Sequence, residues 1–72
     1  MVVPIEVRAA VENLPAVSGP EMALVWAHGM ASCGCDVCKS LFEGRQDSAR
    51  DAAVRLAAAS IRLVEYLNQD WP

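Results

Sequence analysis

The stretch His28-Gly29-Met30-Ala31-Ser32-Cys33-Gly34-Cys35-Asp36-Val37-Cys38 is the part of the sequence around which we expect the fold to be organised. It holds the three cysteines and the single histidine of the chain within eleven residues. Thiolate and imidazole are the ligands that structural zinc prefers, and such sites take four protein ligands in a tetrahedron. The sequence therefore predicts one structural Zn²⁺ ion bound by His28, Cys33, Cys35 and Cys38.

The spacing of these residues is compatible with one site. The C-x-x-C pair of Cys35 and Cys38 allows a tight turn or the start of a helix to direct two sulfurs at one ion. Gly34 can adopt positive φ, so the chain could double back there and add Cys33. With His28 at the end of the preceding helix, the ion would fasten that helix to the one that follows.

Other interpretations of the cysteines remain open. They could be reduced thiols without a metal, since free cysteine is often buried in cores. An iron–sulfur cluster normally requires a fourth cysteine, and a Cys35–Cys38 redox pair usually lies in a βαβ setting. Catalytic zinc needs an open coordination position, which four protein ligands would not leave. We therefore expect no enzymatic activity and no small-molecule substrate.

Length and composition favour one small domain. The chain has 72 residues, of which 54% are hydrophobic but only 6% aromatic. We expect a single compact domain over residues 1–72, with a small core of the size that many proteins reinforce with a metal, a disulfide or a second subunit. The formal net charge of -3 argues against a duplex nucleic-acid binder, because such proteins need a basic face.

The sequence also bears on where the protein is found. The N-terminal residues have no basic segment followed by a sustained apolar run, and no apolar stretch approaches the roughly 20 residues of a membrane span. We expect a cytoplasmic protein with reduced thiols. Many alanines, with five arginines against one lysine, are typical of a GC-rich genome and suggest a bacterial or phage source.

Apolar spacing and breaker residues predict an all-α domain of three or four helices stapled by the zinc ion. The first helix should span about Pro4 to Asn13 and stop before Pro15. The second should start at a Ser18-x-x-Glu21 capping box and end at Gly29. Two more are expected, a short one from about Val37 to Phe42 or Glu43 that Gly44 ends, and a long one from Asp47 or Ser48, with a Ser48/Asp51 capping pair, to Leu67 or Asn68. We expect no sheet, beyond a weak pairing of Val2 and Val3.

The long last helix should bury one face. Winding it at about 100° per residue predicts a buried line of Ala49, Ala53, Leu56, Ser60, Leu63 and Leu67. The same winding places Asp51, Arg55, Ala58, Arg62 and Glu65 on a solvated face, with Val54 and Ile61 forming an exposed apolar patch beside the stripe. We expect Trp71 to fold back onto the core, or else to act as a hook for a partner.

These expectations predict a small cytosolic zinc-binding protein-interaction or regulatory module without catalytic activity. Its partner would be a protein, with a homodimer as one form. The interface would use surplus apolar surface of the helix that contains Met22 to Ala27, together with Val54, Ile61 and Trp71. Two alternatives are a zinc-containing transcription or nucleic-acid regulator and a protein that handles metal or thiol redox chemistry.

Overall fold

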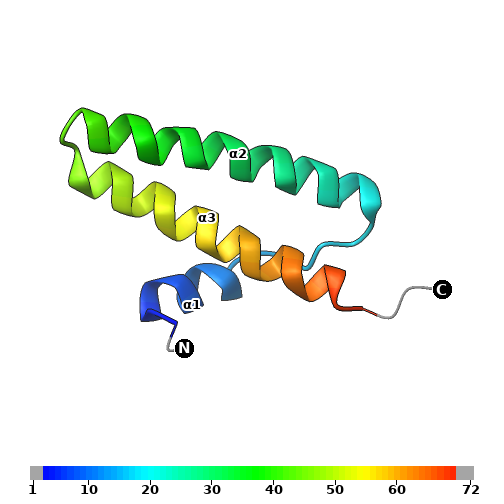
Figure 1. Cartoon of the computed structure of the whole chain (residues 1–72). Helices are drawn as coiled ribbons and strands as arrows, with labels where there is room; N and C mark the ends of the chain where they lie inside the picture. Colours follow the sequence, from blue (N-terminus) through cyan, green and yellow to red (C-terminus); the bar gives the residue numbers. More distant parts are fainter. Residues whose placement is uncertain (1–2, 70–72) are drawn as a thin grey trace.

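A helical hairpin with a short third helix packed against it makes up the described part of the chain. The computed structural model describes residues 3–69, which form α1 (Ile5–Glu12), α2 (Pro20–Phe42) and α3 (Gln46–Leu67). In Figure 1, α2 and α3 run antiparallel side by side, and α1 lies on the side of α3 that faces away from α2. Because these residues contain helices and no strand, the all-α prediction is confirmed. The expectations for Val2 and Trp71 lie outside the described residues.

α2 is one uninterrupted helix of 23 residues, so the predicted break at Gly29 is wrong. Gly29 and Gly34 both have helical conformations, and the segment from Val37 onwards is the last part of α2 rather than a separate helix. A glycine inside a helix costs about 1 kcal/mol relative to alanine. Apolar packing along the inward side of α2 against α3 offsets that cost, so tertiary contact decides the conformation of this segment.

The two long helices are joined by a tight turn at Gly44, where the predicted helix end is confirmed. Gly44 has φ of 74°, a left-handed conformation that favours glycine. The amide of Arg45 donates to the carbonyl of Ser40 over 2.8 Å, and the amide of Gly44 donates to the carbonyl of Leu41 over 3.1 Å. This pair of bonds is a Schellman motif, which satisfies the last carbonyls of α2 and reverses the chain.

The predicted capping residues are not used. Gly19 occupies the N-cap of α2 and Arg45 that of α3, and within the described residues neither helix start has a side-chain cap. The Ser18 hydroxyl instead lies 3.2 Å from the sulfur of Met22. The capping box at Ser18 and the capping pair at Ser48 were therefore wrong, although the helix starts differ from expectation by no more than two residues.

The inward faces of α2 and α3 follow a shared pattern of three- and four-residue spacings. Residues with reduced exposure recur in this way on α2 at Trp26, Met30, Cys33, Val37 and Ser40, and on α3 at Ala49, Ala52, Leu56, Ala59, Leu63 and Tyr66. Such spacing keeps one side of each helix in contact with its neighbour over its whole length. Alanines near the turn allow the two backbones to approach closely.

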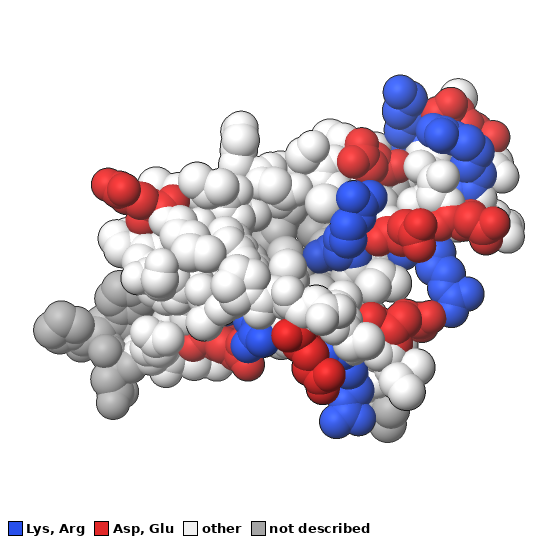
Figure 2. Space-filling model, turned by 180° about the vertical axis from the view of Figure 1, so that it is seen from behind, with Lys and Arg blue, Asp and Glu red and all other residues white. Residues whose placement is uncertain are grey.

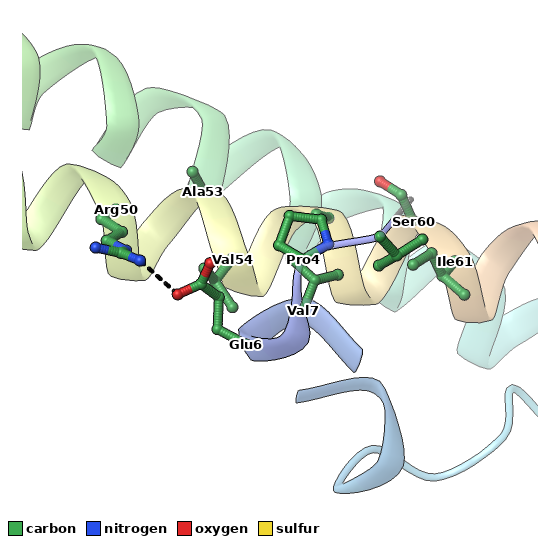
Figure 3. Close-up of a pocket in the computed structure, with 10 residues that line it drawn as sticks. Pro4, Glu6, Val7, Arg50, Ala53, Val54, Ser60 and Ile61 are labelled. Atoms are coloured by element: carbon green, nitrogen blue, oxygen red, sulfur yellow. Dashed lines mark hydrogen bonds and ion pairs between the residues drawn. The ribbon is translucent and has the colours of Figure 1, made fainter. Parts of the chain in front are cut away.

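α1 covers a second face of α3. Arg50 of α3 donates to Glu6 over 2.5 Å, and Arg62 donates to the carbonyl of Val11 over 2.8 Å. Between these contacts Val54 and Ile61 line a groove under α1, as Figure 3 shows. They are half-buried, so the prediction that they form an exposed apolar patch was wrong.

The buried line predicted for α3 was correct only in part, because this helix packs on two sides. Ala53 and Leu67 are exposed, whereas Ala58, which we expected on the solvated face, has no exposed surface. A single amphipathic stripe describes a helix that has one neighbour. α3 lies between α1 and α2 and buries a wider arc.

The resulting core is thin. Among the described residues, the buried apolar side chains are Val7, Val17, Ala49, Ala52, Ala58 and Tyr66, and no large side chain is fully buried. Several large apolar side chains are instead exposed: Ile5, Leu24, Val25, Leu41, Phe42, Val64 and Leu67. The hairpin therefore leaves much of its apolar surface outside its own core.

Candidate functional site

The four predicted zinc ligands all lie on α2, with Cys33 on the opposite side of the helix from the other three. His28, Cys35 and Cys38 are exposed, whereas Cys33 is half-buried on the side that faces α3. Residues separated by two positions are about 200° apart around a helix, so Cys33 and Cys35 lie on opposite sides. Within the described residues no three metal-ligating side chains form a group.

These positions do not fit one tetrahedral site in a single chain. His28 and Cys35 are seven residues apart, which is about 10.5 Å along a helix axis. Two ligands of one zinc ion lie within about 4 Å of each other, because each bond is about 2.0–2.3 Å long. A site formed by all four residues of one chain requires the helix to unwind between them, and that site stays a prediction.

The exposed ligands instead belong to a regular row on the outward face of α2. Exposed residues recur there at spacings of four, three, four, three and four, and we call this row the α2 seam; it consists of Leu24, His28, Ala31, Cys35, Cys38 and Phe42. This is the a/d spacing with which one helix pairs with another along its length. The seam lies on the opposite side of α2 from the residues that pack against α3.

The large apolar side chains of the α2 seam are strongly exposed to solvent. The residue surface of Phe42 is 95% exposed and that of Leu24 is 72% exposed. Val25 and Leu41, beside the seam at its two ends, are also exposed. A row of apolar and soft side chains open to water along a whole helix is typical of an interaction surface rather than of a solvated face.

Charge is sparse along this face. α2 carries only Glu21, Asp36 and Lys39 as charged residues. Charged side chains gather at the end of the molecule where α2 turns into α3, whereas much of the surface away from that end is uncharged in Figure 2. Lys39 lies four residues after Cys35, so its ammonium group is on the adjacent turn of the same side of the helix.

Two grooves also open on the surface of the molecule. One, of about 310 Å³, runs between the hairpin and the end of α1 and includes Trp26, Met30 and Cys33 in its lining. The other, of about 470 Å³, is the α1–α3 groove of Figure 3, where Glu6 and Arg50 are already paired with each other. Both are open and mainly apolar, and neither gathers groups for general acid–base or nucleophilic chemistry.

The periodicity of the α2 seam was available in the sequence and was missed. The spacing from Leu24 to Phe42 is visible without a structure, but it crosses Gly29 and Gly34, which we interpreted as a helix end and a loop. Treating the cysteines as one cluster concealed the fact that two of them belong to the outward row and one to the inward row.

Comparison of the chain with protein-family models, curated proteins and solved structures finds no match. In addition, no helix among the described residues has the length and apolar character needed to cross a membrane. The α2 seam is therefore the candidate functional site of the described residues.

Proposed function

We propose that this protein is a non-catalytic interaction module that binds a helical partner along the α2 seam. The observation that carries the proposal is the uninterrupted a/d spacing of exposed, uncharged residues from Leu24 to Phe42. A partner helix laid along this row would bury Leu24 and Phe42 at the two ends and pack closely at Ala31. Such helix-against-helix recognition depends on anchors at this spacing.

The distribution of arginine supports a protein partner over a nucleic acid. Three of the arginines of the hairpin are paired with carboxylates: Arg45 with Glu43, Arg50 with Glu6 and Arg62 with Glu65. Nucleic-acid binding depends on free basic groups that neutralise phosphates. The net charge of -3 adds to the same preference.

The proposal is tested by position-specific photo-crosslinking in cells that express the full chain. A diazirine amino acid replaces Ala27, which flanks the α2 seam, or Ala53, which is exposed on α3 at the rim of the α1–α3 groove and away from the seam. Both changes start from an exposed alanine in a helix, so they are matched. We expect a discrete crosslinked species from position 27 and little from position 53.

Two controls make the result decisive. Adding Leu24→Glu and Phe42→Glu to the position-27 variant should abolish the crosslink, because two buried anchors would become charged. Equal crosslinking from both positions, or none from position 27, would contradict the proposal. The mass of the adduct identifies the partner, and an adduct of two chains identifies a second copy.

A further inference from the structure

We infer that the helix which occupies the α2 seam is a second copy of this chain, and that Cys35 and Cys38 of the two copies bind one Zn²⁺ ion between them. The inference rests on the proposed function and names its partner. It differs from the four-ligand site within one chain, because it needs neither His28 nor Cys33 and leaves α2 intact.

The ligand geometry is half of a zinc site. Cys35 and Cys38 are consecutive members of the seam, both exposed, and are separated by about 4.5 Å along the axis and about 60° around it. Side chains three residues apart are neighbours on a helix surface, so both sulfurs can reach one ion. Structural zinc takes four ligands, and one chain offers only two in this position. A two-fold axis through the ion supplies the other two.

The register of the seam favours a parallel pair of α2 helices. In a parallel pair each member of the row faces its own copy, so the four cysteines meet while Leu24 meets Leu24 and Phe42 meets Phe42. An antiparallel pair centred on the cysteines would carry Leu24 beyond the end of the partner helix. The parallel arrangement therefore buries the whole seam and completes the metal site at the same time.

The accessible surface of the chain is larger than that of a compact monomer of the same mass. The accessible surface is 5431 Å². A compact monomer of this mass exposes about 4,300 Å², so the whole chain, counted with the residues outside 3–69, exposes roughly 1,100 Å² more. One subunit contributes about 800 Å² to a stable interface of standard size. Pairing along α2 would cover the part of this excess that the exposed seam residues Leu24 and Phe42 contribute.

The charges near the cysteines suit a thiolate-rich site. Binding converts four thiols and one Zn²⁺ ion into a zinc tetrathiolate and releases four protons, so the site carries a charge of about -2. Lys39 lies one turn from Cys35 in each chain, and two copies would place two ammonium groups beside the site. These cations offset part of the charge of the site, whereas Asp36, the other nearby charge, lies about 100° from Cys35 around the helix.

The stoichiometry of zinc tests the inference directly. Full-length protein is prepared anaerobically with a phosphine reductant, loaded with zinc chloride and analysed by native mass spectrometry. We expect a dimer with one zinc ion and a mass deficit of four protons. One zinc ion per monomer would instead support the site formed by one chain, and a zinc-free dimer would show that the metal part of the inference is wrong.

Matched cysteine variants assign the ligands. Cys35→Ser with Cys38→Ser should lose the zinc, whereas Cys33→Ser should keep one ion per dimer, because Cys33 faces α3. Zinc at a free concentration 100-fold above its dissociation constant should tighten the dimer about 100-fold in the wild-type chain. The same zinc should leave the Cys35→Ser/Cys38→Ser variant unchanged. Loss of zinc from the Cys33→Ser variant would overturn the assignment.

The results separate this inference from the proposed function. If the Cys35→Ser/Cys38→Ser variant still crosslinks from position 27 as a dimer and the wild-type chain binds no zinc, the seam pairs two copies without a metal. If the adduct contains a different protein, the seam is an interaction surface but its partner is not a second copy. A dimer that disappears when the reductant is added would indicate a disulfide in place of the metal.

Discussion

Gly44 and Gly29 place opposite demands on the backbone, although both were predicted as helix ends. Gly44 has the left-handed conformation that terminates α2, and no other residue type adopts it without strain except asparagine or aspartate at a small cost. Gly29 has a helical conformation in the middle of the same helix. Beyond its chain neighbours and the adjacent backbone of its own helix, no atom lies within 4 Å of the place where a side chain at Gly29 would begin.

Alanine substitutions should therefore shift stability in opposite directions. Gly29→Ala should raise the free energy of unfolding by about 0.5–1 kcal/mol, because alanine favours the helical backbone. Gly44→Ala should lower it by about 1 kcal/mol, because the left-handed conformation disfavours a β-carbon. Denaturant titrations followed by circular dichroism, at one fixed protein concentration, measure both.

The Gly29 result also tests the structure of the cysteine segment. If residues 28–38 formed a metal-binding loop with Gly29 as a left-handed helix end, Gly29→Ala would destabilise the protein instead. Gly34→Ala is not an equivalent substitution, because Gly34 lies beside the α2 seam and would also alter pairing.

At this scale the sequence did not predict how the four proposed ligands are placed around the helix. Cys35 and Cys38 were predicted to bind one ion together with His28 and Cys33. The two residues share one side of α2, and metal binding by them stays a prediction. Cys33 and His28 were added because four ligands within one chain complete a tetrahedron. Closeness in the sequence does not determine on which side of a helix a side chain lies. For these ligands it depends on whether Gly29 and Gly34 are helical.

At the scale of elements, α1 is held to α3 by two contacts of unequal burial. Arg50 and Glu6 form an ion pair whose side chains are 68% and 42% exposed. Arg62 is only 22% exposed and joins the Val11 carbonyl at the end of α1 to Glu65 of α3. Its Nε is buried without a partner among the described residues, which offsets part of what these bonds contribute.

Removing these charges should affect the docking of α1 unequally. Arg62→Met keeps the apolar stem and should lower the free energy of unfolding by about 1 kcal/mol, because the Val11 carbonyl loses a charged donor in a half-buried place. Arg50→Met should change it by about 0.5 kcal/mol or less, since exposed ion pairs contribute little. Equal losses in thermal unfolding at matched protein concentration would contradict this ranking.

Helix ends defined by strong breakers were predictable from the sequence. The bounds of α1 were correct to one residue because Pro4 and Pro15 restrict the backbone on both sides. The end of α2 at Gly44 was equally clear. The sequence did not predict that α2 is one continuous helix. Whether Gly29 and Gly34 stay helical depends on apolar contact with α3, which is a tertiary effect.

At the scale of the whole molecule, the thin core and the exposed seam have the same origin. α2 divides its apolar residues between an inward row and an outward row, so neither row alone gives the large buried side chains that stabilise a domain of this size. A small domain of this kind gains stability most readily from association. The composition shows how many residues are hydrophobic. Their distribution over two faces of α2 can be recognised only once α2 is known to be one continuous helix.

Thermal stability should therefore depend on protein concentration. For a dimer of this length, a tenfold dilution should lower the midpoint of thermal unfolding by about 5 °C, because dissociation accompanies unfolding. The Leu24→Glu/Phe42→Glu variant should unfold at a lower temperature that does not change with dilution. Val64→Glu, at an exposed apolar position of α3 away from the seam, is the control and should behave as the wild-type chain does.

The two rows on α2 restrict how this helix can change in length during evolution. Inserting or deleting one residue rotates everything beyond it by about 100°, which would misalign the inward row against α3 and the outward row at the same place. Changes of seven or eleven residues keep both rows within about 20° of their direction, and they add or remove about 10.5 or 16.5 Å. Natural variation in the length of this hairpin should consequently occur in steps of seven or eleven residues, with a matching step in α3.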